Sequence, residues 1–210
     1  MKKAFTLLEF IVVISLLILI TTFSNLKIEE NNLENLTNRL VLYLKQTRYQ
    51  SLIDDKNSKN SNLWHKERWT LKFLRCRENV GGIYYVIYSD KNQTGHAGFD
   101  ESLNDPLSNK KIYSSNRCEE NSKNSKYVLI TKIFDIDEVN ISCNKTASLG
   151  QISFGNDGRV YSKLSSYDNE NFEYEIENKC IISLKSYKQG SREIVIEPKT
   201  GYIYKKDESL

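Results

Sequence analysis

The chain has 210 residues and a formal net charge of +3, with 30 Lys and Arg residues against 27 Asp and Glu. This near balance excludes a nucleic-acid function argued from overall charge, and the length is sufficient for one domain with its own core. No serine-hydrolase elbow, zinc-protease helix, P-loop or dinucleotide glycine pattern occurs in the sequence, so we expect no enzyme.

An apolar run occupies residues 5–23, FTLLEFIVVISLLILITTF, and its one ionisable residue is Glu9. The run approaches the ~20 residues that a bilayer-spanning helix needs. Lys2 and Lys3 precede it, which predicts a cytoplasmic N-terminus, a single pass through the inner membrane and an exported remainder. A cleaved secretory signal is disfavoured because no small-x-small site follows the run. The presence of Glu9 in this run requires an explanation, because burying a charge in hydrocarbon costs about 2.5–3.5 kcal/mol.

The helix that begins with this run is expected to continue to residue 53, because no Pro or Gly interrupts residues 5–53. Its second half carries leucines at three- and four-residue steps, namely Leu33, Leu36, Leu40 and Leu44. The prediction is therefore one helix over 5–53. Its first part, 5–23, spans the membrane, and its second part packs on a globular domain.

Residues 54–210 predict a β-rich periplasmic head. Nine segments alternate in polarity or are rich in β-branched and aromatic residues: 68–76, 82–90, 126–135, 139–143, 150–155, 158–162, 179–187, 192–198 and 201–205. Asn-Asp-Gly at 156–158 and Lys-Thr-Gly at 199–201 indicate hairpin turns. The sequence therefore predicts an α+β fold in which a long N-terminal helix packs on antiparallel strands, arranged as a sandwich or a strongly curved sheet.

Four cysteines lie in the predicted head: Cys76, Cys118, Cys143 and Cys180. None forms a C-x-x-C pair and both histidines lie far from them in sequence, which disfavours a zinc or redox site. In an oxidising compartment an even number of cysteines indicates disulfides. Of the three connectivities we favour Cys76–Cys118 with Cys143–Cys180, and free buried thiols are the alternative.

Residues 90–101 have the ligand spacing of an EF-hand calcium loop. Asp90, Asn92 and Thr94 occupy the first, third and fifth positions, Gly95 the sixth and Glu101 the twelfth. Threonine is a weaker ligand than the usual Asp or Asn, and a strand precedes the loop instead of a helix. We therefore favour an Asn/Gly turn in which Asp90 caps its own backbone, with calcium binding as the alternative.

The N-terminal residues KKAFTLLEFIVVISLLILI resemble the start of type IV pilins and pseudopilins. The resemblance implies that a prepilin peptidase removes residues 1–4 by cutting between Ala4 and Phe5, and that Phe5 is then N-methylated. Ala4 stands where the family usually has Gly, which implies slower processing. The resemblance also implies that Glu9 neutralises the new amine of Phe5 on a neighbouring subunit, because a buried ion pair offsets part of the desolvation of both charges.

The C-terminal segments ISFGNDGRVYS, CIISL and REIVIEPKTGYIY resemble the GspH/FimT group of minor pseudopilins. The group implies a structural subunit of a type II secretion pseudopilus or a type IV pilus. Its implied partners are other pilins, the prepilin peptidase and an inner-membrane assembly platform. One alternative is a single-pass anchored periplasmic protein that joins no filament. Another is a DNA-uptake minor pilin, whose phosphate contacts would come from Arg75, Arg77, Lys110 and Lys111.

Overall fold

The computed structural model describes residues 6–24, 31–56, 62–168 and 170–206, with residues 22–24 described by their backbone alone. The chain divides into two compact units, Met1–Asn31 and Asn32–Leu210. The boundary therefore falls within the stretch that the sequence predicted to be one helix.

The first unit contains α1 (Leu7–Ser24), and the next helix, α2 (Asn32–Ile53), belongs to the second unit. Asn31 is not helical. The prediction of one long helix over 5–53, and with it the long-helix fold class, is therefore wrong. Absence of Pro and Gly does not by itself continue a helix, and asparagine is among the residue types that favour a helix start.

Within the described residues, no helix combines the length and apolarity needed to cross a membrane. α1 has 18 residues. Its first turn also carries the charged Glu9. The predicted membrane span over 5–23, and the inner-membrane location derived from it, are corrected by this finding.

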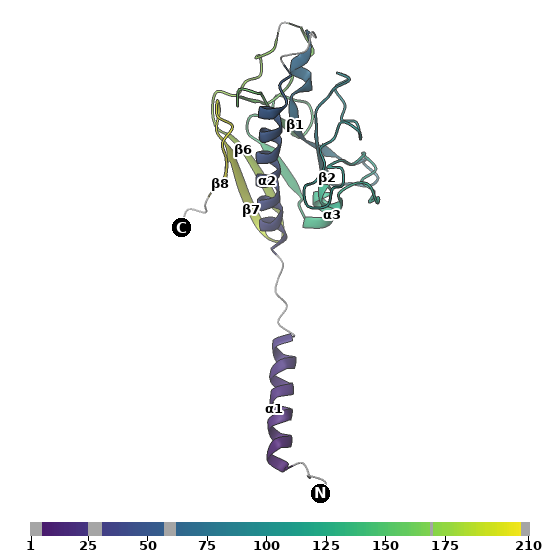
Figure 1. Ribbon diagram of the computed structural model, residues 1–210, viewed down its shortest axis with the longest axis vertical. Coiled ribbons are helices and arrows are strands. Elements are labelled where there is room, and N and C mark those ends of the chain that lie inside the picture. Colours follow the sequence, from purple (N-terminus) through teal and green to yellow (C-terminus); the bar gives the residue numbers. More distant parts are fainter. Residues whose placement is uncertain (1–5, 25–30, 57–61, 169, 207–210) are drawn as a thin grey trace. The chain divides into compact units, whose positions relative to one another are not determined.

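In the second unit, α2 packs against two four-stranded antiparallel sheets (Figure 1). The first sheet has the order β2-β1-β4-β5, with β1 (Trp69–Arg75), β2 (Ile83–Tyr88), β4 (Gly150–Phe154) and β5 (Val160–Tyr161). The second has the order β3-β6-β7-β8, with β3 (Glu138–Ile141), β6 (Cys180–Ser186), β7 (Gly190–Ile196) and β8 (Ile203–Lys205). Three short helical turns complete the unit, η1 (Trp64–Glu67), η2 (Lys126–Val128) and α3 (Ile130–Phe134).

Eight of the nine predicted strands are present within the described residues. The exception is 126–135, which forms η2 and α3. Ile130 and Phe134 are both buried and lie four residues apart, which is the spacing of one helical face. The hairpin predicted at 156–158 joins β4 to β5, and the one at 199–201 joins β7 to β8.

The leucine stripe of α2 forms the centre of the core. Leu33, Leu36, Leu40 and Leu44 are all fully buried, and α2 contacts strands of both sheets. Polar contacts hold α2 near both ends. The amide N–H of Leu33 donates to Oε1 of Gln189 at 2.7 Å, and Nε of Arg48 donates to the carbonyl oxygen of Thr200 at 2.8 Å. The predicted packing of this stripe on a globular domain is confirmed.

His65 in η1 is fully buried, which gives the second unit a pH dependence. Its Nε2 lies 3.0 Å from the carbonyl oxygen of Ser165, so Nε2 carries the proton and donates. Burial lowers the pKa of the His65 imidazole below its ordinary value, and the nearby charge of Arg68 lowers it further. The unfolded chain therefore takes up a proton more readily than the folded one. This contribution to stability is complete above the ordinary pKa of about 6.5 and is lost as the pH falls below it.

We therefore expect the urea midpoint of unfolding to fall between pH 7 and pH 5, by more in the parent chain than in His65→Gln. Equilibrium unfolding at a series of pH values measures the difference. His96→Gln is the matched control because His96 is exposed, and it should keep the parent profile. Parallel profiles for the parent and His65→Gln would contradict the prediction.

Candidate functional site

The first turn of α1 is closed by two residues, Thr6 and Glu9. The amide N–H and the Oγ1 hydroxyl of Thr6 donate to Oε2 of Glu9 at 2.8 and 2.9 Å. In return, the amide N–H of Glu9 lies 3.3 Å from Oγ1 of Thr6. This reciprocal arrangement is a capping box, which satisfies N–H groups that a helix start leaves without partners. Sequence reasoning singled out Glu9 but missed Thr6, although Thr-x-x-Glu before an apolar run is the signal of this cap.

The capping box leaves part of the Glu9 carboxylate unused. Both bonds from Thr6 end on Oε2, and within the described part of the chain Oε1 accepts no hydrogen bond. Glu9 is exposed. The carboxylate is therefore held in a fixed position with one oxygen available to an external cation. Ala4 and Phe5, the predicted processing residues, lie outside the described residues.

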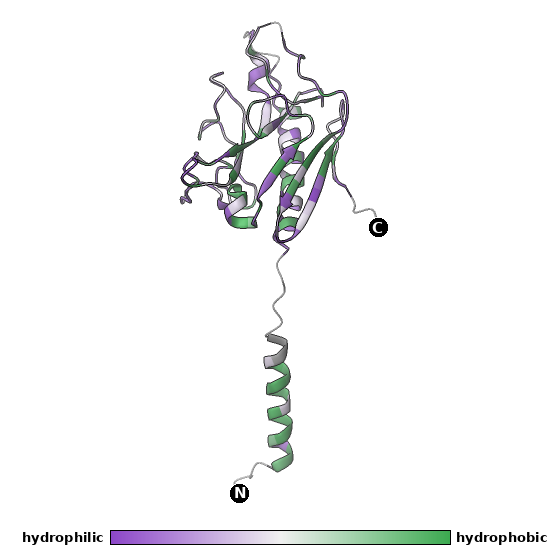
Figure 2. Ribbon diagram, turned by 180° about the vertical axis from the view of Figure 1, so that it is seen from behind, coloured by the Kyte–Doolittle hydropathy of each residue, from purple (hydrophilic) through white to green (hydrophobic). Residues whose placement is uncertain are grey.

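Beyond Glu9, α1 presents apolar side chains around its whole circumference, and Figure 2 shows the helix coloured as hydrophobic along most of its length. We call this the α1 apolar surface, and its members include Leu7, Leu8, Phe10, Ile11, Val12, Leu16 and Leu17. Leu7 is 79% exposed and Leu17 is 54% exposed. A helix that is apolar on every side is normally buried, and large exposed apolar patches mark interaction sites. The first unit by itself therefore leaves the α1 apolar surface without a cover.

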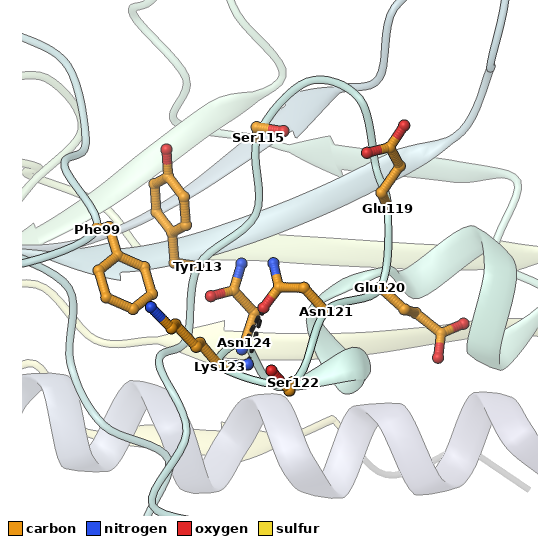
Figure 3. Close-up of a pocket in the computed structure, with 9 residues that line it drawn as sticks. All are labelled: Phe99, Tyr113, Ser115, Glu119, Glu120, Asn121, Ser122, Lys123 and Asn124. Carbon is orange, nitrogen blue, oxygen red and sulfur yellow. Dashed lines mark hydrogen bonds between the residues drawn. The ribbon is translucent and has the colours of Figure 1, made fainter.

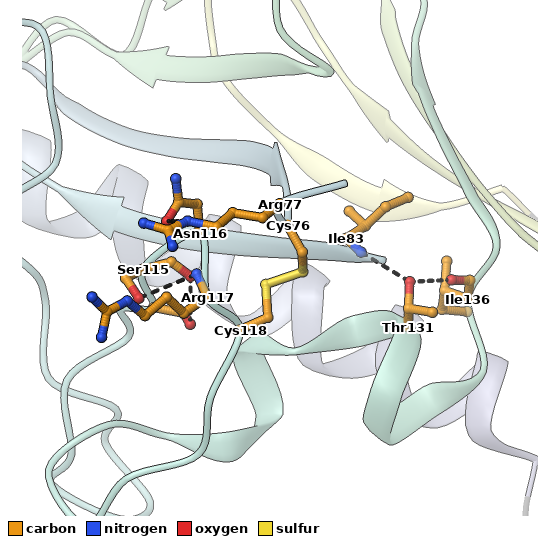
Figure 4. The surroundings of a disulfide bond; sticks show 10 residues. Cys76, Arg77, Ile83, Ser115, Asn116, Arg117, Cys118, Thr131 and Ile136 are labelled. Carbon is orange, nitrogen blue, oxygen red and sulfur yellow. Dashed lines mark hydrogen bonds between the residues drawn. A yellow bond between two sulfur atoms is a disulfide. The ribbon is translucent and has the colours of Figure 1, made fainter. Parts of the chain in front are cut away.

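Two disulfides stabilise the second unit, Cys76–Cys118 and Cys143–Cys180, the pairing that the sequence favoured. Cys76 directly follows β1 and binds the loop around Cys118, beside which Arg77 Nε donates to Oδ1 of Asn116 at 3.1 Å (Figure 4). Cys180 is the first residue of β6, and Cys143 lies just beyond β3. Each disulfide therefore ties a loop to a strand of the core.

The four residues of the predicted calcium loop do come together, but they bind the loop's own backbone. Asp90 accepts the amide N–H groups of Thr94 and Gly95 at 3.0 and 2.7 Å. Asn92 Oδ1 accepts from Thr94, and the two Glu101 carboxylate oxygens accept backbone N–H groups. Burial also raises the pKa of Asp90, which disfavours its charged form. No group of three or more His, Cys, Asp or Glu residues in the described chain is placed to hold a metal ion. The geometry is that of the Asn/Gly turn.

Two basic residues of the DNA-uptake alternative, Arg77 and Lys111, donate hydrogen bonds to neighbouring parts of the chain. Arg75 and Arg77 lie at the end of β1, where Arg77 donates to Asn116. Lys111 is half-buried, and its Nζ donates to the carbonyl oxygen of Ser102 at 2.8 Å. Phosphate binding by the four residues as a set gains no support from this arrangement.

Comparisons of the chain with protein-family models, with curated proteins and with solved structures found no match. The fold and the site define a two-unit α+β protein. One unit carries an exposed apolar helix with a carboxylate in its capped first turn, and the other consists of two sheets around α2 with two disulfides that tie loops to strands.

Proposed function

We propose that this protein is a minor pilin-like structural subunit that joins a type IV pilus or a type II secretion pseudopilus through α1. The observation that carries the proposal is the α1 apolar surface, combined with the available Oε1 of Glu9 in its first turn. The resemblance of the first 19 or so residues to pilins and pseudopilins supports the same assignment. The protein acts by assembly and not by catalysis.

Burial of the α1 apolar surface supplies the driving force for assembly. Each Leu, Ile, Val or Phe side chain that moves from water into an apolar contact contributes about 1.5–3 kcal/mol. Side chains on all sides of α1 are exposed, so several neighbouring helices are needed to cover them. A bundle of α1 helices from adjacent pilin-like subunits provides that cover.

Glu9 sets the register of the assembly. Prepilin peptidase cleavage after Ala4 and N-methylation of Phe5 leave a positive amine at the start of each subunit. The carboxylate of Glu9 pairs with that amine on a neighbour, and either charge alone would be expensive to bury. The capping box holds the carboxylate in place before the neighbour arrives.

Two substitutions separate this role from simple capping. Glu9→Gln keeps a side chain that serves in a capping box but removes the charge. Thr6→Ala removes the cap and keeps the charge. In cells that express the other filament subunits, we expect Glu9→Gln to reduce the fraction of the chain recovered with sheared and sedimented filaments to background. Thr6→Ala should reduce that fraction far less.

The reverse order, in which Thr6→Ala fails to assemble and Glu9→Gln assembles like the parent, would reduce Glu9 to a helix cap and overturn the pairing. Intact-mass measurement of each variant checks the processing step separately. Recovery of the parent chain with Met1 still attached, in cells with a working processing enzyme, would overturn the pilin assignment itself.

A further inference from the structure

The second unit contains an open pocket with a volume of about 470 Å³ that the assembly role does not use (Figure 3). Phe99 and Tyr113 form one wall, and residues 119–124 form the opposite wall and the floor. This volume falls within the 300–1,000 Å³ typical of pockets for small molecules. The pocket lies entirely within the second unit, so it does not depend on α1.

The loop that surrounds the pocket is fixed at two places. At its base, the amide N–H of Lys111 donates to the carbonyl oxygen of Lys123 at 3.0 Å. The amide N–H of Ser125 donates to the carbonyl oxygen of Lys111 at 2.9 Å. Between them, Cys118 is joined to Cys76 at the end of β1. The walls are therefore in place before any ligand binds, which lowers the entropy cost of binding.

The aromatic wall offers an apolar platform made of two perpendicular rings. The rings of Phe99 and Tyr113 meet edge to face, with centroids 5.9 Å apart and planes at 89°. Both side chains are half-buried, so each keeps some ring surface open. Aromatic faces carry partial negative charge and attract the weakly positive C–H groups of a ligand that lies flat on them.

The floor presents two amide groups with defined orientations. Oδ1 of Asn121 accepts the amide N–H groups of Lys123 and Asn124 at 2.9 Å each, so its Nδ2 is left as a donor. Asn124 is 7% exposed, and its Oδ1 has no hydrogen-bond partner in the described residues. Figure 3 shows the two amides side by side, with both nitrogen atoms directed toward the space between Tyr113 and Glu119 and the Asn124 oxygen turned to the Phe99 side. A buried acceptor without a donor costs about 1–3 kcal/mol, which a ligand hydroxyl group would offset.

Opposite charges border the pocket. Glu119 and Lys123 both line it and are exposed, and neither forms an ion pair within the described chain. Glu120 is already paired with Lys132 at 2.8 Å. One acid and one base partly cancel, so neither a strong anion nor a strong cation is favoured. The best ligand is neutral, has groups that both donate and accept, and presents one flat C–H face.

We infer that this pocket binds a neutral saccharide ring. The C–H face of a pyranose packs against the Phe99 and Tyr113 rings, stacking on the face of one of them. Its hydroxyl groups accept from Nδ2 of Asn121 and donate to Oδ1 of Asn124 and the carboxylate of Glu119. The inference goes beyond the filament role and does not require it.

Saturation-transfer NMR on the full chain tests the inference, with a polyoxyethylene detergent to keep α1 in solution because that detergent carries no sugar. The probes are the methyl glycosides of glucose, galactose and N-acetylglucosamine at millimolar concentration. We expect transfer to at least one glycoside, with the strongest signal on the ring C–H protons. Tyr113→Ala should weaken binding by about tenfold or more, because it removes the platform.

Asn121→Asp provides a sharper variant, because a carboxylate still accepts the two backbone N–H groups that hold the turn but no longer donates. It should weaken binding of the same glycoside severalfold. Tyr187→Ala is the control, since Tyr187 is an exposed tyrosine outside the pocket. The inference is overturned if no glycoside shows transfer, or if Tyr113→Ala and Tyr187→Ala bind the glycoside equally. Transfer to sodium acetate with none to the glycosides would identify an anion site and would also overturn it.

Discussion

Leu40→Ala is expected to lower the free energy of unfolding of the second unit by about 2–5 kcal/mol. Leu40 is fully buried in the middle of α2, within the core that both sheets share with this helix. Removing its branched end loses the transfer free energy of the deleted carbons and leaves a cavity that the neighbours fill incompletely. Urea unfolding followed by the fluorescence of Trp69, which is buried in β1, measures the change.

Leu42→Ala is the matched control for this prediction. Leu42 lies on the same helix and undergoes the same chemical change, but it is 47% exposed. Its loss should therefore cost less than about 1 kcal/mol. Equal effects at the two positions would mean that α2 is not part of the core of the second unit.

The strands were predictable because their signals are local. β6 alternates buried residues with intermediate or exposed ones, and β7 ends in the β-branched run Ile194-Val195-Ile196. A tight turn joins the two strands into a hairpin. Segment 126–135 has the same composition but forms η2 and α3. The secondary structure of this segment was decided by the tertiary packing of Ile130 and Phe134 and not by β-propensity.

The division between α1 and α2 was not predictable from the absence of helix breakers. The leucine stripe of α2 packs on the sheets of the second unit, whereas α1 belongs to the other compact unit. The start of α2 therefore coincides with the start of its packing on the second unit, although the sequence contains no Pro or Gly at this boundary.

The two candidate sites, Glu9 in α1 and the pocket of the second unit, differ in how well they could be predicted from the sequence. Glu9 stands out because it is one charge in an apolar run, and its partner Thr6 lies three residues away. The pocket has no such local signal. Phe99, Tyr113 and Asn124 come together because the loop closes on Lys111 and because Cys118 is joined to Cys76, and both are long-range contacts. The Asn, Ser, Glu and Lys residues of segment 115–124 predict a polar loop and do not indicate a binding site.

Removal of either disulfide is expected to lower the free energy of unfolding by about 4 kcal/mol, because the unfolded chain gains the entropy of an open loop of some forty residues. The sequence separations are 42 for Cys76–Cys118 and 37 for Cys143–Cys180. Loop entropy grows only with the logarithm of length, so paired Cys→Ser variants of the two bridges should agree within a few tenths of a kcal/mol. Urea unfolding under non-reducing conditions measures both.

The two variants should differ, however, at the pocket. Cys118 lies in the loop between Tyr113 and Asn121, whereas Cys143–Cys180 joins the region beyond β3 to β6, and neither of these two cysteines lines the pocket. At a urea concentration where both variants are folded, loss of Cys76–Cys118 should weaken glycoside binding while loss of Cys143–Cys180 leaves it unchanged. Equal binding by both variants would show that the hydrogen bonds of Lys111 suffice to hold the walls. Unequal stabilities would mean that strain or residual structure, and not loop entropy, decides what each bridge contributes.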